Sequence, residues 1–284
     1  MTWQPAADWR PLLAGTGQSN GGVWLTPSRE VVKRLVPGVQ DHRHHGYWER
    51  QALIAESGID RSTPGLRSPA CLGVERDAGG ITLRMAYVPA AGWSPLALAA
   101  ALGRFASAGV EEPAWGARDV LRDRLATVER RGGWSALEGA GLPRKLVAAV
   151  DSLWVRRSAA LDVLDALPRV PVHGDAHPVN LLGRDGDDVL AIDWEQFGLG
   201  PAGFDLAYLL LAVDTPLDEL LEAHDGDTAV VRRGAVLVAA YTAVSRAAWA
   251  LSQPDPGDHV ERLALMAAVA EEAVDAASSE PGRW

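Results

Sequence analysis

The sequence predicts an α+β protein, in which a small antiparallel β-sheet with one helix is followed by a larger, mainly α-helical part. Up to about residue 88, short apolar runs alternate with turns rich in glycine, proline and asparagine, a pattern typical of strands. Beyond residue 92 the chain is rich in alanine and leucine with helical spacing. We therefore expect two domains, residues 1–88 and residues 89–284.

Length and composition are those of a globular protein. The chain has 284 residues, 48% hydrophobic and 23% charged, enough for one large or two modest cores. No apolar run reaches the roughly 18 residues of a membrane span, and Met1–Pro5 does not resemble a signal peptide. Cys71 is the only cysteine, which excludes an internal disulfide and a cysteine-based zinc site. We expect a cytoplasmic protein that does not bind membranes.

The first predicted elements are two strands around a glycine-rich turn, within residues 12–25. Asn20-Gly21 is a strong hairpin signal and is expected to form this turn, which also contains Gly15 and Gly17. Backbone amides on such a turn can hold phosphate groups. Asn20 and Gly21 are therefore candidate phosphate-binding residues, although most glycine-rich hairpins bind no ligand.

A further strand is predicted over residues 30–35, and it carries Lys33. The chain contains 25 arginines and only two lysines, Lys33 and Lys145. In a chain that uses arginine almost everywhere, a lysine indicates a site that needs a compact ammonium group rather than a planar guanidinium. Chance retention is the alternative.

A helix is predicted next over residues 47–56, where apolar residues recur at i, i+4 and i+7. The preceding His42, His44 and His45 could indicate a metal, but no carboxylate or cysteine spacing completes a site, so we expect a solvated loop. A strand follows over residues 81–89. Later helices are predicted over residues 95–107, 118–131, 143–166, 203–213, 228–252 and 259–277.

The segment from residue 172 to residue 193 carries the most specific chemistry. Two apolar runs flank an Asp-Gly pair, so the second run is expected to fold back on the first as a hairpin. This fold brings Asp193 close to Asn180 and Asp175. Mg²⁺ prefers oxygen ligands, and the Asn180 amide and the Asp193 carboxylate supply them. Asp175 is then left to accept the proton of an attacking hydroxyl.

The same segment resembles a known family. His-Gly-Asp-x-His-x-x-Asn at 173–180, followed by Ile-Asp-Trp at 192–194, is similar to the motif of the aminoglycoside phosphotransferases and choline kinases, relatives of the protein kinases. Residues 200–207 resemble the family's segment leading into the next helix. The resemblance implies a bilobal protein-kinase-like fold, ATP or GTP with Mg²⁺, and phosphorylation of a small-molecule hydroxyl.

The resemblance also implies roles for individual residues. Asp175 becomes the catalytic base, and Asn180 and Asp193 hold Mg²⁺. Lys33 grips the nucleotide phosphates and is oriented by a glutamate of the next helix, for which the family pattern favours Glu49 over Glu56.

Further roles follow from the same resemblance. Ala86 and Val88 lie at the interlobe hinge, where backbone groups pair with the purine. His173 and Asp205 brace the catalytic loop, with a plain helix N-cap as the alternative for Asp205. The role of His177 stays open.

Acidic charge is concentrated in the last third of the chain. From Asp193 onward there are 16 acidic and 5 basic residues, whereas residues 1–88 have 8 and 10. Such a field attracts cations and repels nucleic acid, so we expect no nucleic-acid partner. We expect a cationic acceptor, an aminoglycoside or basic peptide antibiotic, contacted by Trp194 and Glu195. Solvated helix faces explain the acidity equally well.

Other interpretations stay open. The 11 tryptophans could form an aromatic cage for choline or another amino alcohol, and a sugar or homoserine-like acceptor is also compatible. A nucleotide-binding protein without catalysis is a third possibility. The alternation of His173, Asp175 and His177 suits a metal-dependent hydrolase, although Gly174 and Pro178 disfavour a regular strand. A purely structural role for the polar residues is a further alternative. The sequence does not decide between a monomer and a dimer.

Overall fold

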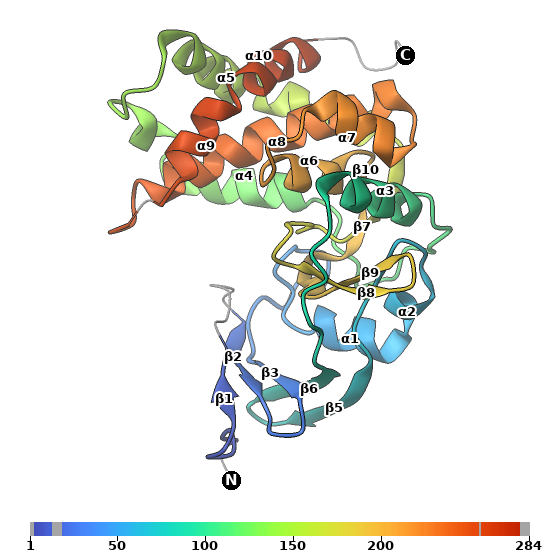
Figure 1. Cartoon of the computed structure of the whole chain (residues 1–284). Coiled ribbons are helices and arrows are strands. Elements are labelled where there is room, and N and C mark those ends of the chain that lie inside the picture. Colours follow the sequence, from blue (N-terminus) through green and yellow to red (C-terminus); the bar gives the residue numbers. More distant parts are fainter. Residues whose placement is uncertain (1–2, 13–18, 256, 279–284) are drawn as a thin grey trace.

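The computed structural model describes residues 3–12, 19–255 and 257–278. A five-stranded sheet lies at one end of the molecule and the long helices lie at the other (Figure 1). The strands are β1 (Arg10–Pro11), β2 (Asn20–Leu25), β3 (Glu30–Leu35), β4 (Leu66–Arg67), β5 (Cys71–Asp77), β6 (Gly80–Ala86), β7 (Arg169–Val172), β8 (Leu181–Asp185), β9 (Asp188–Ala191) and β10 (Gly198–Pro201).

The helices account for most of the chain after β6. They are α1 (Arg50–Ser57), α2 (Ile59–Ser62), α3 (Pro95–Ala106), α4 (Val120–Arg130), α5 (Arg144–Ala166), α6 (Phe204–Leu210), α7 (Leu217–His224), α8 (Thr228–Ala250), α9 (His259–Leu265) and α10 (Ala267–Ala276), with 3₁₀ helices η1 (Ser135–Leu137) and η2 (Trp194–Gln196). This α+β architecture is the one that the sequence predicts. None of the described helices is both long enough and apolar enough to cross a membrane.

The large sheet is antiparallel in the order β1-β2-β3-β6-β5. Its core is formed by Leu35 of β3 and Ile81 of β6, which cluster with Ala52 of α1. Burial of these side chains holds α1 against the sheet. The register places Lys33 beside Leu83 in the middle of the sheet, so its ammonium group has a rigid support.

The predicted hairpin is present and belongs to a second sheet, of order β4-β9-β8. Asp185 pairs with Asp188, so Gly186-Asp187 forms the turn. β4 pairs in parallel with β9 through Leu66 and Val189. Through this pairing, the segment that follows α2 is joined to the hairpin.

Helix α8 is the centre of the helical part. Every residue from 234 to 244 is buried, and α8 packs against α6, α9 and α10. A helix buried all round must satisfy its polar groups internally. Tyr241 Oη does so by donating a hydrogen bond of 2.7 Å to Leu153 O in α5.

Three local predictions differ from the structure. The helix predicted over residues 259–277 is divided at Met266 into α9 and α10. Neither α7 nor the four-residue α2 was predicted. Both are too short for a helical period to stand out in the sequence.

The hairpin turn predicted at Asn20-Gly21 is wrong. Both residues lie in β2, where Asn20 pairs with Leu35. Asn20 Oδ1 accepts a hydrogen bond from Gly22 N at 2.9 Å, and Gly22 has a φ of 126°. The turn-forming tendency of the sequence is therefore expressed as a β-bulge within the strand. Gly15 and Gly17 lie outside the described residues.

Candidate active site

The loop after β7 is held in place by one buried carboxylate. Asp205, in the first turn of α6, accepts hydrogen bonds from His173 N at 2.7 Å and from Gly174 N at 2.9 Å. Burial raises the pKa of Asp205 to about 6, although His173 and these two hydrogen bonds oppose the shift. Gly174 has a φ of 83°, and a Cβ there would lie 2.5 Å from Gln196 O. Asp205 thus holds the loop through its side chain.

The ring of His173 connects this loop to the hairpin. Its Nε2 lies 2.9 Å from Ile192 O, and its Nδ1 accepts a hydrogen bond from Asp175 N at 3.3 Å. Both ring nitrogens are therefore engaged within the protein. This geometry counts against the hydrolase interpretation, because a metal ligand needs a free ring nitrogen.

Asp175 and Asn180 face each other across the loop. Asn180 Nδ2 donates to Asp175 O at 2.9 Å and to Asp175 Oδ2 at 3.1 Å. With its nitrogen engaged in this way, the Asn180 amide oxygen is left for another partner. The Asp175 side chain is 28% exposed and can reach a ligand.

Asp193 occupies the junction between β9 and η2 in a left-handed conformation, with φ 66° and ψ 52°. Such a conformation is uncommon for a residue with a Cβ and is found at functional sites. Asp193 Oδ1 accepts hydrogen bonds from Lys33 Nζ at 2.7 Å and from Gln51 Nε2 at 2.8 Å. Burial acts to raise the pKa of Asp193, but Lys33, His173 and Gln51 together outweigh it, and the pKa lies below the ordinary value.

The structure therefore gathers the predicted oxygen ligands and Lys33. Ile192 N donates to Asn180 O at 2.8 Å, which fixes the segment bearing Asp193 beside the loop that carries Asp175 and Asn180. The Asn180 amide oxygen and the Asp193 carboxylate form a donor set that suits Mg²⁺. Carboxylate, amide and ammonium come from segments up to 160 residues apart.

Glu49 is not the partner of Lys33, contrary to the prediction. Within the described part of the chain, Lys33 forms its ion pair with Asp193, while Glu49 is the N-cap of α1. The expected helix starts three residues late, so Gln51 on its buried face reaches the site instead. The sequence offered no signal for Gln51, because a glutamine on a helix face is ordinary.

The two residues predicted to contact the purine, Ala86 and Val88, lie in different surroundings. The Ala86 N–H donates to Ala70 O at 2.9 Å, so it cannot also bind a purine. Val88 follows β6, and its side chain lies against the hairpin at Gly183. The predicted phosphate contacts, Asn20 and Gly21, lie in β2, the strand next to the one that carries Lys33.

Trp194 is a core residue, which overturns its predicted contact with substrate. Its side chain is buried, donates from Nε1 to Ala191 O at 2.8 Å, and packs against Phe105 and His173. Glu195 is half-buried. Burial raises its pKa to about 7, and the nearby Asp193 adds to the shift.

A fully buried arginine fastens the surroundings of the site. Among the described residues, the acceptors of the Arg50 hydrogen bonds are all main-chain oxygens. These acceptors belong to His42, His44, His45, Trp115 and Glu195. Burial lowers the pKa of Arg50 to about 10. The histidine segment is thus fixed to α1 and η2, and the sequence did not reveal this role.

The histidine segment is not the plain solvated loop that the sequence predicted. Asp123 of α4 accepts a hydrogen bond from His45 N at 3.1 Å, and its Oδ2 lies 3.3 Å from His45 Nδ1. His44, His45 and Asp123 could bring three ligand atoms within 4.8 Å of one another. However, His44 Nδ1 already accepts from Gly46 N, and Arg124 places a positive charge nearby.

His177 faces a cavity of about 250 Å³, which it lines together with Arg246 and Arg262. Burial lowers the pKa of His177, and the charge of Arg246 adds to this shift. Arg246, from α8, also lies 3.6 Å from Asp175. No sequence pattern connected α8 with the catalytic loop.

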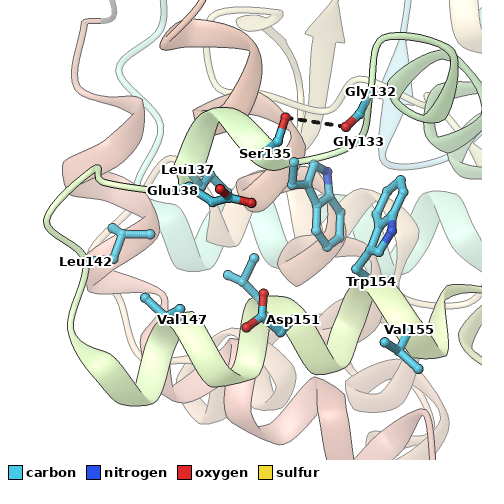
Figure 2. Close-up of a pocket in the computed structure, with 12 residues that line it drawn as sticks. Gly132, Gly133, Ser135, Leu137, Glu138, Leu142, Val147, Asp151, Trp154 and Val155 are labelled. Carbon is cyan, nitrogen blue, oxygen red and sulfur yellow. Dashed lines mark hydrogen bonds between the residues drawn. The ribbon is translucent and has the colours of Figure 1, made fainter.

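Another cavity, of about 340 Å³, lies between the η1 segment and α5 (Figure 2). Trp154 and Asp151 of α5 line it, together with Leu137 and Glu138. None of its lining residues belongs to the 172–193 segment. Its carboxylates are therefore not part of the candidate active site.

Comparisons with known proteins agree with this geometry. The sequence model of the phosphotransferase enzyme family matches residues 10–235. No curated protein matches the sequence. The structure of a choline/ethanolamine kinase family protein from Mesorhizobium loti is similar, with 19% identity and a TM-score of 0.60 over 95% of this chain and 92% of that one.

Two further structures share the fold. Choline kinase from Streptococcus pneumoniae is 16% identical, with a TM-score of 0.57 over 95% of each chain. Aminoglycoside 2′-phosphotransferase-IIIa, in its GDP complex, is 17% identical, with a TM-score of 0.56 over 94% of this chain and 92% of that one. At these identities the likeness is one of fold.

Proposed function

We infer the reaction from one premise: the chain belongs to the phosphotransferase enzyme family. We propose that it transfers the terminal phosphoryl group of ATP or GTP to a hydroxyl group of a small molecule, with Mg²⁺. The observation that carries this proposal is the meeting of Asp175, Asn180, Asp193 and Lys33 at one site. Phosphoryl transfer requires this combination of a base, oxygen ligands and a cation.

The residues divide the work as follows. The Asp175 carboxylate accepts the proton of the acceptor hydroxyl, whose oxygen bonds to phosphorus as the bond to the nucleoside diphosphate breaks. Lys33 supplies positive charge to the phosphates from the centre of the sheet. The Asn180 amide oxygen and the Asp193 carboxylate would hold Mg²⁺, which neutralises phosphate charge when it is bound. His173 and Asp205 keep the loop rigid, so that reacting groups meet in a fixed orientation.

We place the nucleotide between residues 1–88 and residues 89–284. Lys33 projects from the first part and Asp193 from the second, and they already form an ion pair of 2.7 Å. Solved structures with this fold hold ADP, GDP, ATP or AMP, according to their descriptions. A triphosphate bound here would contact both parts of the chain.

The choice of acceptor needs separate support. Structures of similar fold include both aminoglycoside phosphotransferases and choline kinases, so a cationic antibiotic and an amino alcohol are both candidates. Three of the acidic residues that suggested a cation are engaged elsewhere, however. Asp214 pairs with Arg262, Asp218 pairs with Arg232, and Asp227 caps α8.

Nucleotide-dependent phosphate transfer by two lysine variants tests the proposal. Lys33→Met should lose transfer from ATP and GTP, whereas Lys145→Met, at the only other lysine, should retain it because Lys145 is exposed. Acceptors should include aminoglycosides, amino alcohols, sugars and hydroxy acids. Nucleotide binding without transfer to any acceptor would favour the non-catalytic alternative.

A further inference from the structure

Three arginine side chains line a cavity that adjoins Asp175 through Arg246. The cavity has a volume of about 250 Å³ and lies between α4 and α8. Arg124, Arg131 and Arg246 line it, together with His45. Among the described residues, no aspartate or glutamate does so. The cavity is therefore suited to a negatively charged group.

Two of these guanidinium groups are positioned by one aromatic ring. The Cζ atoms of Arg124 and Arg246 lie 5.2 Å and 5.1 Å from the centroid of the Tyr208 ring. Such stacking fixes the planes of the guanidinium groups without neutralising their charge. Both groups are thus held in place before any ligand arrives.

The positive charge of the cavity is only partly balanced. Arg124 donates at 2.6 Å to Gln196 Oε1, an oxygen of a neutral amide. Arg246 lies 3.6 Å from one carboxylate, Asp175. Burial lowers the pKa of Arg124 to about 10, and Arg246 adds to this shift although Asp175 and Glu195 oppose it. Partly desolvated like charges destabilise each other until an anion joins them.

We propose that the acceptor carries a carboxylate or phosphate group, which binds to Arg124 and Arg246 while its hydroxyl reaches Asp175. This inference rests on the proposed function and names its substrate class. A guanidinium matches both oxyanions through paired hydrogen bonds. The contact between Arg246 and Asp175 sets the anionic group beside the reacting hydroxyl.

The rim of the cavity adds to the argument. Trp249 is 43% exposed and lines the cavity together with Arg131, so an apolar surface and a third cation face an entering ligand. An ammonium group would meet no carboxylate among the lining residues. Arg246 and Trp249 lie beyond the family match at residues 10–235, whereas Arg124 and Arg131 lie within it.

A charge-matched series of sugars tests the proposal. Glucuronate, glucose 6-phosphate, glucose and glucosamine share one ring but carry a carboxylate, a phosphate, no charge and an ammonium group. Binding to the full chain is measured by titration calorimetry, with Mg²⁺ and ADP present. We expect at least one anionic sugar to bind about tenfold more tightly than glucose and glucosamine, since charge-assisted hydrogen bonds contribute that much. Comparison of glucuronate with glucose 6-phosphate shows whether the cavity prefers a carboxylate or a phosphate.

Variants assign the binding to the cavity. Arg246→Met should weaken binding of the preferred anionic sugar about tenfold or more. Arg131→Met, at the exposed rim, should weaken it less and keeps the test valid if Arg246→Met does not fold. Arg130→Met is the matched control, because Arg130 is an exposed neighbour that does not line the cavity.

Several outcomes would overturn the inference. They are equal or tighter binding of glucosamine, absence of binding by both anionic sugars at millimolar concentration, and anion binding unchanged in both Arg246→Met and Arg131→Met. A higher KM for ATP in Arg246→Met, with unchanged sugar binding, would assign Arg246 to the nucleotide instead. Transfer to neutral or cationic acceptors alone would leave the proposed function standing. Anionic sugar binding without transfer to any acceptor would remove the proposed function while leaving the anion site.

Discussion

The two sides of Asp175 have opposite electrostatic character. On the metal side, Asp193 and Asn180 present oxygen atoms, and Lys33 holds one carboxylate oxygen. On the side where we propose that the acceptor binds, called the acceptor side below, Arg124 and Arg246 present guanidinium groups with few anionic partners. The oxygen atoms of the first side suit the proposed Mg²⁺, and the guanidinium groups of the second side suit the proposed anionic acceptor. Each side therefore carries the charge opposite to that of its proposed ligand. Asp175, the proposed base, lies between the two sides.

The pKa shifts follow this division. Burial raises the pKa of Glu195 to about 7 on the metal side, and the carboxylate of Asp193 adds to the increase. Burial lowers the pKa of Arg124 to about 10 on the acceptor side, where Arg246 contributes in the same direction. Like charges crowd on each side, with opposite sign.

The largest predicted effect is on phosphate transfer and comes from a substitution at the proposed metal site. Asp193→Asn should reduce phosphate transfer by about a thousandfold or more, because it removes a charged ligand from a site that works by charge stabilisation. The hydrogen bonds from Lys33 and Gln51 can persist to the asparagine oxygen. Circular dichroism should therefore show a folded protein. Asp175→Asn should lose transfer to a similar extent, and retained turnover in either variant would contradict the assignment.

The next prediction concerns Arg50, which fixes the histidine segment to α1 and η2. Arg50→Met should lower the free energy of unfolding by about 3 kcal/mol, since it leaves buried main-chain oxygens without their donor. The measurement is urea denaturation. Arg122→Met is the control: its ion pair with Asp165 is nearly half exposed and should contribute under about 1 kcal/mol. Equal midpoints for the two variants would show that Arg50 does not fasten this region.

A smaller effect is expected from the support of Asp193. Gln51→Ala removes the 2.8 Å hydrogen bond to Asp193 Oδ1 but leaves Lys33 in place. The Mg²⁺ concentration needed for half-maximal transfer should increase about tenfold, as is usual when a group that orients a metal ligand is lost. Gln40→Ala, at an exposed glutamine whose side chain donates a hydrogen bond to Gly38 O, is the control. An unchanged Mg²⁺ requirement in Gln51→Ala would leave Lys33 as the main support of Asp193.

The metal side could be predicted from sequence much better than the acceptor side. Asp175 and Asn180 are five residues apart, and the tight turn that follows Asp185 brings Asp193 back to them. Such contacts depend on local geometry, which short patterns record. Lys33 was predictable through its rarity and through the family resemblance. The long helices were predictable because their apolar periods are strong.

The rest depends on tertiary packing. Glu49 and Gln51 differ by two positions on one helix, so a start three residues late decides which side chain faces Lys33. Arg246 is one of 25 arginines, and nothing in its neighbourhood marks it as the one that reaches Asp175. The acidic last third does not by itself decide the acceptor, because net charge ignores which carboxylates are paired. The electric field at Asp175 depends on how far each charge lies from it in the fold, and not on the net charge of a stretch of sequence.

The smallest predicted effect sharpens the acceptor side through the titration of His45. Burial lowers the pKa of His45 below 6.5, Arg124 and His44 lower it further, and Asp123 opposes them. Arg124→Met should therefore move the NMR titration of His45 to higher pH, whereas Arg130→Met should leave it unchanged. Because the folded pKa lies below 6.5, the native state binds fewer protons than the unfolded chain, so stability decreases as pH falls through 6.5. This acid-side loss should be smaller in Arg124→Met. An unchanged pKa of His45 in Arg124→Met would show that the charge of Arg124 does not affect His45.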